Sequence, residues 1–171
     1  MEFQAIHDRL KSIEAPGLMG FDLPRPADKE TKDKGRSGNP YVEVDPQQLV
    51  HFLGACKADP ELHFEMLVDI TASDPSADGD DLWVLTEIIS VKHKHRLSIK
   101  SILPKAAASM PSTVPAHRAS QWHERECSEM YGITFEGHPD PRHILLPDDW
   151  EGFPMRKDYV FPTEYHGISC E

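Results

Sequence analysis

The sequence predicts an α+β fold: a two-layer domain with a mostly antiparallel or mixed sheet packed by helices, plus an extended, proline-rich C-terminal arm. Three stretches place apolar residues at helical spacing, and three others have the pattern of strands. Beyond Gly132, prolines at 139, 141, 147, 154 and 162 remove backbone donors and exclude a helix. We therefore divide the chain into an N-terminal helix and flexible linker (1–40), an α+β core (41–132) and the C-terminal arm (133–171).

The formal net charge of −11 is uneven along the chain. Residues 1–40 carry seven acidic and seven basic side chains, residues 41–119 carry eleven and seven, and residues 120–171 carry eleven and four. Without a basic stripe, nucleic acid is a poor partner. The three cysteines are widely spaced and odd in number, which favours a reducing compartment. We expect neither a secretory signal nor a membrane-inserted segment, because no apolar run approaches about eighteen residues.

The first forty residues predict one helix and a linker. Phe3, Ile6, Leu10 and Ile13 recur at helical spacing, which predicts a helix over 2–14 that closes the core. From Gly17 to Pro40 the chain is rich in Pro, Gly, Asp and Lys, as in a loop. We expect this loop, and the charge run 29–36 within it, to be flexible and solvated.

The second helix has a clear start signal. Asp45 can cap it, Pro46 suits the first helical position, and Gln48 completes a capping box. Its predicted buried residues share one face: Leu49, Phe52, Leu53 and Cys56. Cys56 is therefore expected to be a core residue.

The middle of the chain predicts a sheet. Residues 65–71 have the pattern of a strand, and a turn rich in Asp, Ser and Gly follows over 73–81. Residues 82–91 and 96–103 are two further strands, and the short loop between them predicts an antiparallel hairpin.

A third helix is predicted to end at Gly132, where a C′ glycine would stop it, with Ser112 or Thr113 capping its start. Its expected apolar face is Ala119, Trp122, Glu126 and Met130. On that face Trp122→Ala should cost about 3 to 5 kcal/mol. A buried Glu126 would need a cation, which Arg142 or Arg156 of the C-terminal arm could supply.

The C-terminal arm carries many large apolar residues between its prolines. They are Ile144, Leu145, Leu146, Trp150, Phe153, Tyr159 and Phe161. Each gains roughly 1.5 to 3 kcal/mol only when another surface buries it. The arm must therefore fold back on its own domain or lie on a partner.

Few residue patterns in the chain point to chemistry of its own. His123, Cys127, His138 and His143 could hold zinc in a small metal-dependent hydrolase, although their spacing matches no established finger. Three scattered cysteines do not supply an iron-sulfur cluster. The glycines do not form a dinucleotide or phosphate loop, and no nucleophile elbow is present.

Four motifs in the last third of the chain identify a family. They are Glu124-Arg125-Glu126, then Glu129-Met130-Tyr131-Gly132, then Gly137-His138-Pro139 with Arg142, and the run from Gly152 to Tyr159. Together they resemble the signature of the C subunit of bacterial NADH:quinone oxidoreductase, respiratory complex I, which related hydrogenase subunits share. Pro141 and His143 depart from the family pattern.

The resemblance implies a non-catalytic scaffold subunit in the peripheral arm of a proton-translocating complex. The implied partners are other peripheral-arm subunits, above all the large subunit that shapes the quinone site. No flavin or iron-sulfur cluster is expected in this chain, because the resemblance places them in partner subunits on the cytoplasmic side of the membrane. The docking and signature residues are Trp122, Glu124, Arg125, Glu126, Tyr131, Gly132, His138, Arg142, Trp150, Arg156, Lys157, Asp158 and Tyr159.

Overall fold

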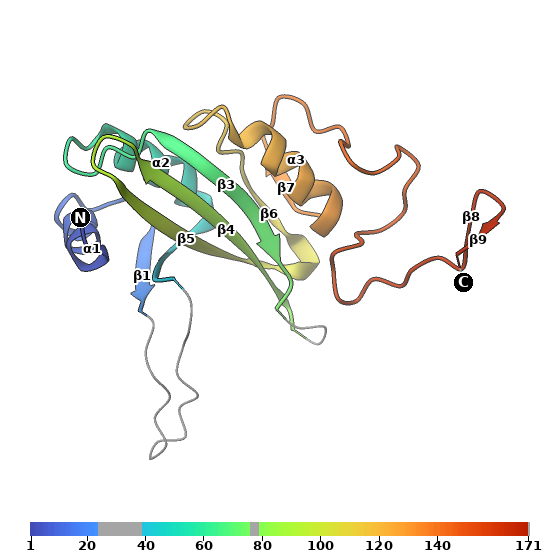
Figure 1. The fold of residues 1–171 in the computed structure, drawn as a ribbon. Helices are drawn as coiled ribbons and strands as arrows, with labels where there is room; N and C mark the ends of the chain where they lie inside the picture. The colour runs from blue at the N-terminus through green and yellow to red at the C-terminus, as the bar shows by residue number, and fades with distance from the viewer. Residues whose placement is uncertain (24–38, 76–78, 171) are drawn as a thin grey trace, which may run out of the picture.

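The computed structural model describes residues 1–23, 39–75 and 79–170 (Figure 1). Its centre is a five-stranded sheet in the order β1-β2-β5-β4-β3. The strands are β1 (Leu18–Asp22), β2 (Tyr41–Val44), β3 (Met66–Ser73), β4 (Asp81–Ser90) and β5 (His95–Pro104). The β2–β5 pair is parallel and the other pairs are antiparallel, so the sheet is mixed. The predicted α+β class is confirmed.

The hairpin of β4 and β5 forms the middle of the sheet. Its register runs without interruption from Asp81 opposite Pro104 to Ser90 opposite His95. Alternate residues of β4, beginning at Leu82, are buried, while the residues between them are partly exposed. This period of two gives the sheet a covered face and an open face.

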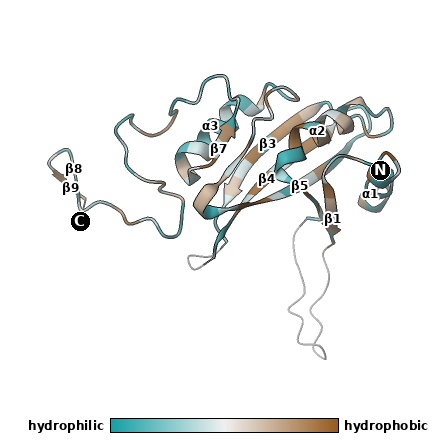
Figure 2. Cartoon of the chain, turned by 180° about the vertical axis from the view of Figure 1, so that it is seen from behind, coloured by the Kyte–Doolittle hydropathy of each residue, from teal (hydrophilic) through white to brown (hydrophobic). Residues whose placement is uncertain are grey.

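The helices cover one face of this sheet (Figures 1 and 2). They are α1 (Phe3–Ser12), α2 (Leu49–Ala58) and α3 (Ser120–Tyr131), and the turn η1 (Pro46–Gln48) precedes α2. The predicted face of α2, from Leu49 to Cys56, is fully buried. The Asp45 carboxylate accepts a hydrogen bond from the Gln47 N–H at 2.9 Å, so Asp45 caps the turn η1 as predicted. The predicted capping box with Gln48 is wrong, because Gln48 is the N-cap residue of α2 and no side chain caps that helix. Within the described part of the chain, no helix is long and apolar enough to cross a bilayer.

Residues 18–22 correct the prediction of a continuous loop from Gly17 to Pro40. They form the edge strand β1, which pairs with β2. Its residues alternate between partly buried and exposed, with the Met19 side chain 73 % exposed, so the strand lacks the fully buried apolar face of the other strands. The charge run 29–36 lies outside the described residues.

Helix α3 connects the main sheet with a smaller one. It packs against β3, and the short strands β6 (Ser109–Pro111) and β7 (Thr134–Glu136) form a parallel pair beside it. The turn η2 (Lys105–Ala107) lies between β5 and β6. Gly132 ends the helix in the left-handed region, at φ 70°, as predicted. The predicted Ser112 or Thr113 cap is wrong, because the N-cap is Ala119 and no side chain caps the helix.

The predicted buried face of α3 is also wrong. Trp122 is 62 % exposed, and Glu126 is exposed. The buried residues of α3 are Ser120, Glu124, Arg125, Cys127 and Glu129. The prediction from apolar spacing fails here because three charged side chains, Glu124, Arg125 and Glu129, point inward. Other segments of the chain form hydrogen bonds with them there.

Within the described residues, the C-terminal arm contains no helix and no strand between β7 and Glu164. A small hairpin of β8 (Glu164–Tyr165) and β9 (Ile168–Ser169) follows. Figure 1 shows the arm turning back beside α3 and then running away from the domain, with β8 and β9 at its far end. The arm therefore has a root on the domain and an outer part away from it.

The corrected helix face changes the expected effect of Trp122→Ala. Because the side chain is exposed, we expect the free energy of unfolding to change by no more than about 0.5 kcal/mol. Phe52→Ala, in the fully buried face of α2, should cost about 3 to 5 kcal/mol. Denaturant unfolding of both variants checks this contrast, and equal losses would contradict the assigned burial.

Candidate functional site

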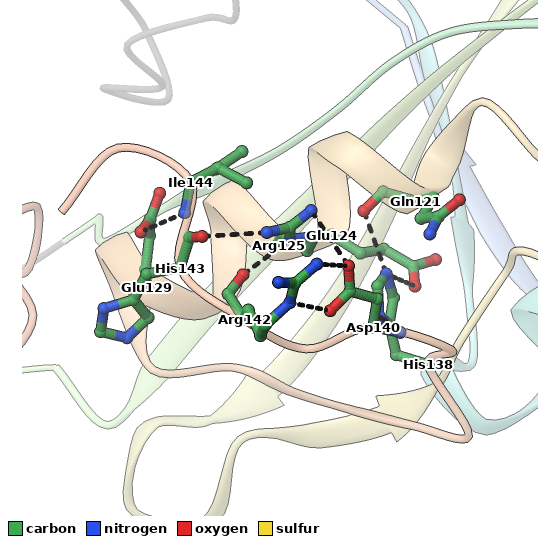
Figure 3. Close-up of polar contacts among 9 residues, drawn as sticks. All are labelled: Gln121, Glu124, Arg125, Glu129, His138, Asp140, Arg142, His143 and Ile144. Carbon is green, nitrogen blue, oxygen red and sulfur yellow. Dashed lines mark hydrogen bonds and ion pairs between the residues drawn. The ribbon is translucent and has the colours of Figure 1, made fainter. Parts of the chain in front are cut away.

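The candidate site is the region where α3 meets the root of the C-terminal arm (Figure 3). Its first component is the Glu124 carboxylate, which is fully buried. It accepts hydrogen bonds from the Ser112 hydroxyl at 2.6 Å, the Thr113 hydroxyl at 2.6 Å and the Thr113 N–H at 2.7 Å. Three donors stabilise the charge that burial would otherwise penalise. This carboxylate therefore joins α3 to the loop after β6.

His138 fixes the first turn of the arm against α3. Its Nδ1 accepts a hydrogen bond from the Asp140 N–H at 3.1 Å, and its Nε2 lies 3.0 Å from the Gln121 carbonyl oxygen. An Nδ1 acceptor requires the proton of the neutral ring to be on Nε2, which donates to Gln121. The ring thus has a structural role in this turn.

Arg125 holds the next part of the arm through its backbone. Its Nε donates to the Arg142 carbonyl at 2.6 Å, and a terminal nitrogen donates to the His143 carbonyl at 2.9 Å. The central carbon of its guanidinium lies 5.2 Å from the centre of the exposed Trp122 ring. Planar, multidentate donation of this kind is specific to arginine.

Asp140 links two arginines. It pairs with Arg142 through two hydrogen bonds, of 2.7 and 2.9 Å, and lies 3.5 Å from Arg125. The Arg142 guanidinium lowers the pKa of the Asp140 carboxyl to about 2. The expected pairing of Arg142 with Glu126 is therefore wrong. Arg142 forms its ion pair with Asp140, and Glu126 lies on the exposed side of α3.

Glu129 is the third charged side chain of the buried α3 face. Its carboxylate accepts hydrogen bonds from three consecutive backbone N–H groups, those of Ile144 at 3.1 Å, Leu145 at 2.9 Å and Leu146 at 3.2 Å. Successive amides that converge on one anion form a compact anion-binding turn. Glu129 thereby fixes the backbone of the arm without using its apolar side chains.

The end of α3 is the last contact of the arm with the helix. The Arg156 Nε donates to the Tyr131 carbonyl at 2.6 Å, and the guanidinium lies 4.7 Å from the centre of the Phe153 ring. That ring covers Gly132 so closely that an added Cβ would meet it at 2.5 Å. The expected pairing of Arg156 with Glu126 is therefore also wrong, and Gly132 is required both for its backbone angle and for this contact.

Lys157 connects the arm with the end of β3. Its N–H donates to the Asp74 carboxylate at 2.9 Å, and its ammonium group donates to the Pro75 carbonyl at 2.8 Å. Asp158 is exposed beside it.

Trp150 and Tyr159 lie in a separate aromatic cluster in the outer part of the arm. Phe161 is 6.2 Å from each of their rings, measured between ring centres, and Tyr165 lies 5.6 Å from Trp150. The structure thus distributes the predicted docking residues over the arm root, the end of α3 and this cluster.

The four candidate zinc ligands do not converge. Cys127 is buried and its thiol points to the Ile70 carbonyl, while His123 pairs with Asp69 at 3.0 Å and His143 lies against the Pro147 carbonyl. Burial raises the pKa of the Cys127 thiol. Among the described residues, no group of three or more His, Cys, Asp or Glu side chains is arranged to hold a metal ion. The side chains predicted to hold zinc thus have separate partners in the described structure.

Sequence reasoning missed the roles of Ser112, Thr113, Asp140 and Glu129. One signal was available, because Ser120, Glu124 and Cys127 recur at i, i+4 and i+7 with small residues on both sides of a carboxylate. The partners of that carboxylate cannot be identified by helical spacing, since they lie eleven and twelve residues before it.

The buried carboxylate yields a direct test. Glu124→Ala leaves three donors without an acceptor, so we expect a loss of about 3 to 5 kcal/mol in the free energy of unfolding. Glu126→Ala, on the exposed side of the same helix, is the matched control and should change it by less than about 0.5 kcal/mol. Comparable losses in the two variants, measured by denaturant unfolding, would show that Glu124 is not the buried anchor.

Solved structures show the same fold. The trypsin-resistant fragment (1–134) of Nqo5 superimposes with a TM-score of 0.60 and 20 % identity, covering 82 % of this chain and 99 % of that one. A chain of the membrane-bound sulfane sulfur reductase, an archaeal respiratory membrane complex, gives a TM-score of 0.68 and 23 % identity over 92 % of this chain and 84 % of that one.

Three relatives illustrate the sequence similarity, each named as the C subunit of NADH-quinone oxidoreductase. The protein of Chloroherpeton thalassium is 41 % identical over 73 % of this chain and 51 % of its own length. That of Mycolicibacterium smegmatis is 36 % identical over 74 % and 55 %, and that of Streptomyces coelicolor is 32 % identical over 96 % and 65 %. This chain spans about half the length of most curated relatives that it matches.

The family profile described as respiratory-chain NADH dehydrogenase, 30 Kd subunit, matches residues 42–165. This match includes the core from β2 onward, α3 and most of the C-terminal arm. The chain therefore belongs to the family of the 30 kDa subunit of respiratory-chain NADH dehydrogenase.

Proposed function

We propose that this chain is a non-catalytic scaffold subunit of a proton-translocating NADH:quinone oxidoreductase. In this proposal its C-terminal arm docks on the large subunit that shapes the quinone site. The observation that carries the proposal is the way in which the arm is held. Glu129 and Arg125 bind its backbone, which leaves many of its side chains available to a partner.

The apolar side chains of the arm support a docking role. Those that the domain leaves exposed are Leu145, Phe153, Met155, Val160, Phe161 and Ile168. Exposed apolar residues gathered on one segment are typical of an interaction surface. The prolines limit the conformations of the free arm and so reduce the entropy lost on binding.

The redox chemistry belongs to the assembled complex in this proposal. The flavin and the iron-sulfur clusters are assigned to partner subunits, and this chain is assigned none. The protein would be held peripherally at the cytoplasmic side of the membrane by its neighbours. The same scaffold could serve a related membrane-bound hydrogenase, an alternative favoured only by the fold shared with a respiratory membrane complex of different chemistry. Identification of the co-purified subunits would decide between the two complexes.

Substitution of Arg156 and Lys157 by alanine tests the docking role. Both side chains hold the outer arm against the domain through single backbone carbonyls. We expect the isolated protein to retain its fold, with the free energy of unfolding lowered by no more than about 1 kcal/mol. Incorporation into the complex should fall, and NADH-driven quinone reduction by membranes should fall in proportion.

A double variant Lys11→Ala, Lys92→Ala removes the same charge at sites away from the arm and should assemble normally. If the Arg156 and Lys157 variant also assembles at wild-type levels but turns over poorly, the arm contributes to the quinone chemistry and the scaffold proposal is wrong.

A further inference from the structure

The outer part of the C-terminal arm encloses a pocket of about 320 Å³. We call it the arm pocket. Its lining includes three aromatic rings, three carboxylates and one histidine: Trp150, Tyr159, Tyr165, Asp149, Glu151, Glu164 and His166. No residue of the main sheet or of the three helices lines it. The arm therefore builds a concave site of its own, beyond the contacts that fix its root.

Contacts within the arm hold the walls of this pocket. The Tyr165 hydroxyl donates to the Asp149 carboxylate at 2.9 Å, and His166 lies 2.8 Å from the same carboxylate. The Trp150 and Tyr165 rings pack 5.6 Å apart between centres. The β8–β9 turn closes this side, with His166 and Gly167 both at positive φ. The pocket is thus defined by specific contacts.

Two carboxylates of the arm pocket, Glu151 and Glu164, are not balanced by the arm itself, whereas Asp149 lies beside His166. Arg142 is paired with Asp140, whereas Arg156 and Lys157 are directed to backbone carbonyls at the domain. In the described part of the chain, Glu151 and Glu164 have no cationic side chain within ion-pair distance. The pocket therefore presents aromatic rings together with two carboxylates, Glu151 and Glu164, that no cation of the described chain pairs.

We propose that the arm pocket binds an arginine side chain presented by the neighbouring subunit on which the arm docks. A guanidinium stacks on the faces of Trp and Tyr rings and pairs with carboxylates in the same plane. Anionic ligands would be repelled, and a purely apolar side chain would leave the carboxylates unpaired in a desolvated interface. This inference rests on the proposed docking function and specifies the chemistry of the partner surface.

A small probe tests the pocket on the full chain. N-acetyl-L-arginine amide, titrated into the 15N-labelled protein, should shift the indole signal of Trp150 saturably and leave those of Trp83 and Trp122 unchanged. The neutral isostere N-acetyl-L-citrulline amide should bind at least about tenfold more weakly, because it lacks the charge. Equal shifts with both probes, or no shift at Trp150, would overturn the proposal.

Two variants locate the effect. Glu151→Gln with Glu164→Gln removes charge without changing shape and should weaken probe binding by roughly tenfold. Glu136→Gln with Asp148→Asn removes two arm charges outside the pocket and serves as the matched control. Unchanged binding in the Glu151 and Glu164 variant would overturn the proposal.

In the whole complex, the same pocket variant should reduce retention of the protein at high salt, while the control pair should not. If the pocket variant assembles normally while the Arg156 and Lys157 variant does not, the docking function is supported. The proposal that the arm pocket binds an arginine is then wrong. If removal of residues 148–171 leaves assembly intact, the docking function itself is wrong.

Discussion

A buried carboxylate must be surrounded by donors, and helix α3 carries two of them, Glu124 and Glu129. An unpaired charge in the interior costs several kcal/mol, so the segments that supply the donors must hold their geometry. Glu124 is satisfied by the loop after β6, and Glu129 by three amides of the C-terminal arm. Helix α3 thereby joins the smaller sheet to the C-terminal arm. The helix also packs against β3 of the main sheet.

In this arrangement, the residues that hold the arm on the domain differ from the residues that the outer part of the arm exposes. At the root, Arg125 and Glu129 bind carbonyl and amide groups, so position is set by the backbone. Farther out, Trp150, Tyr159 and Tyr165 gather around acidic side chains that the domain does not neutralise. In the proposed docking role, a root that the domain already holds lowers the cost of ordering the arm when the partner binds.

The sequence predicted those elements whose partners are near in sequence or whose pattern is regular. The β4–β5 hairpin and the buried face of α2 follow from periods of two and 3.6, and both are confirmed. Strand β1 was missed because Met19 and Phe21 lie at its exposed positions, so its apolar residues do not mark a buried face. Helical spacing identified the right turn of α3 but assigned Glu126, and not Glu124, to the interior. That spacing followed Trp122 and Met130, and only the tertiary fold brings Ser112, Thr113 and the arm into hydrogen-bonding distance of Glu124 and Glu129.

Amide hydrogen exchange at residues 144–146, in the wild-type protein and in Glu129→Ala, tests most directly whether α3 carboxylates hold the arm. If the carboxylate accepts all three bonds, these amides should exchange at least about tenfold more slowly than exposed amides in the wild type and lose that protection in the variant. Amides in β4 should stay protected in both proteins. Fast exchange at 144–146 in the wild type, or protection that persists in Glu129→Ala, would contradict the account.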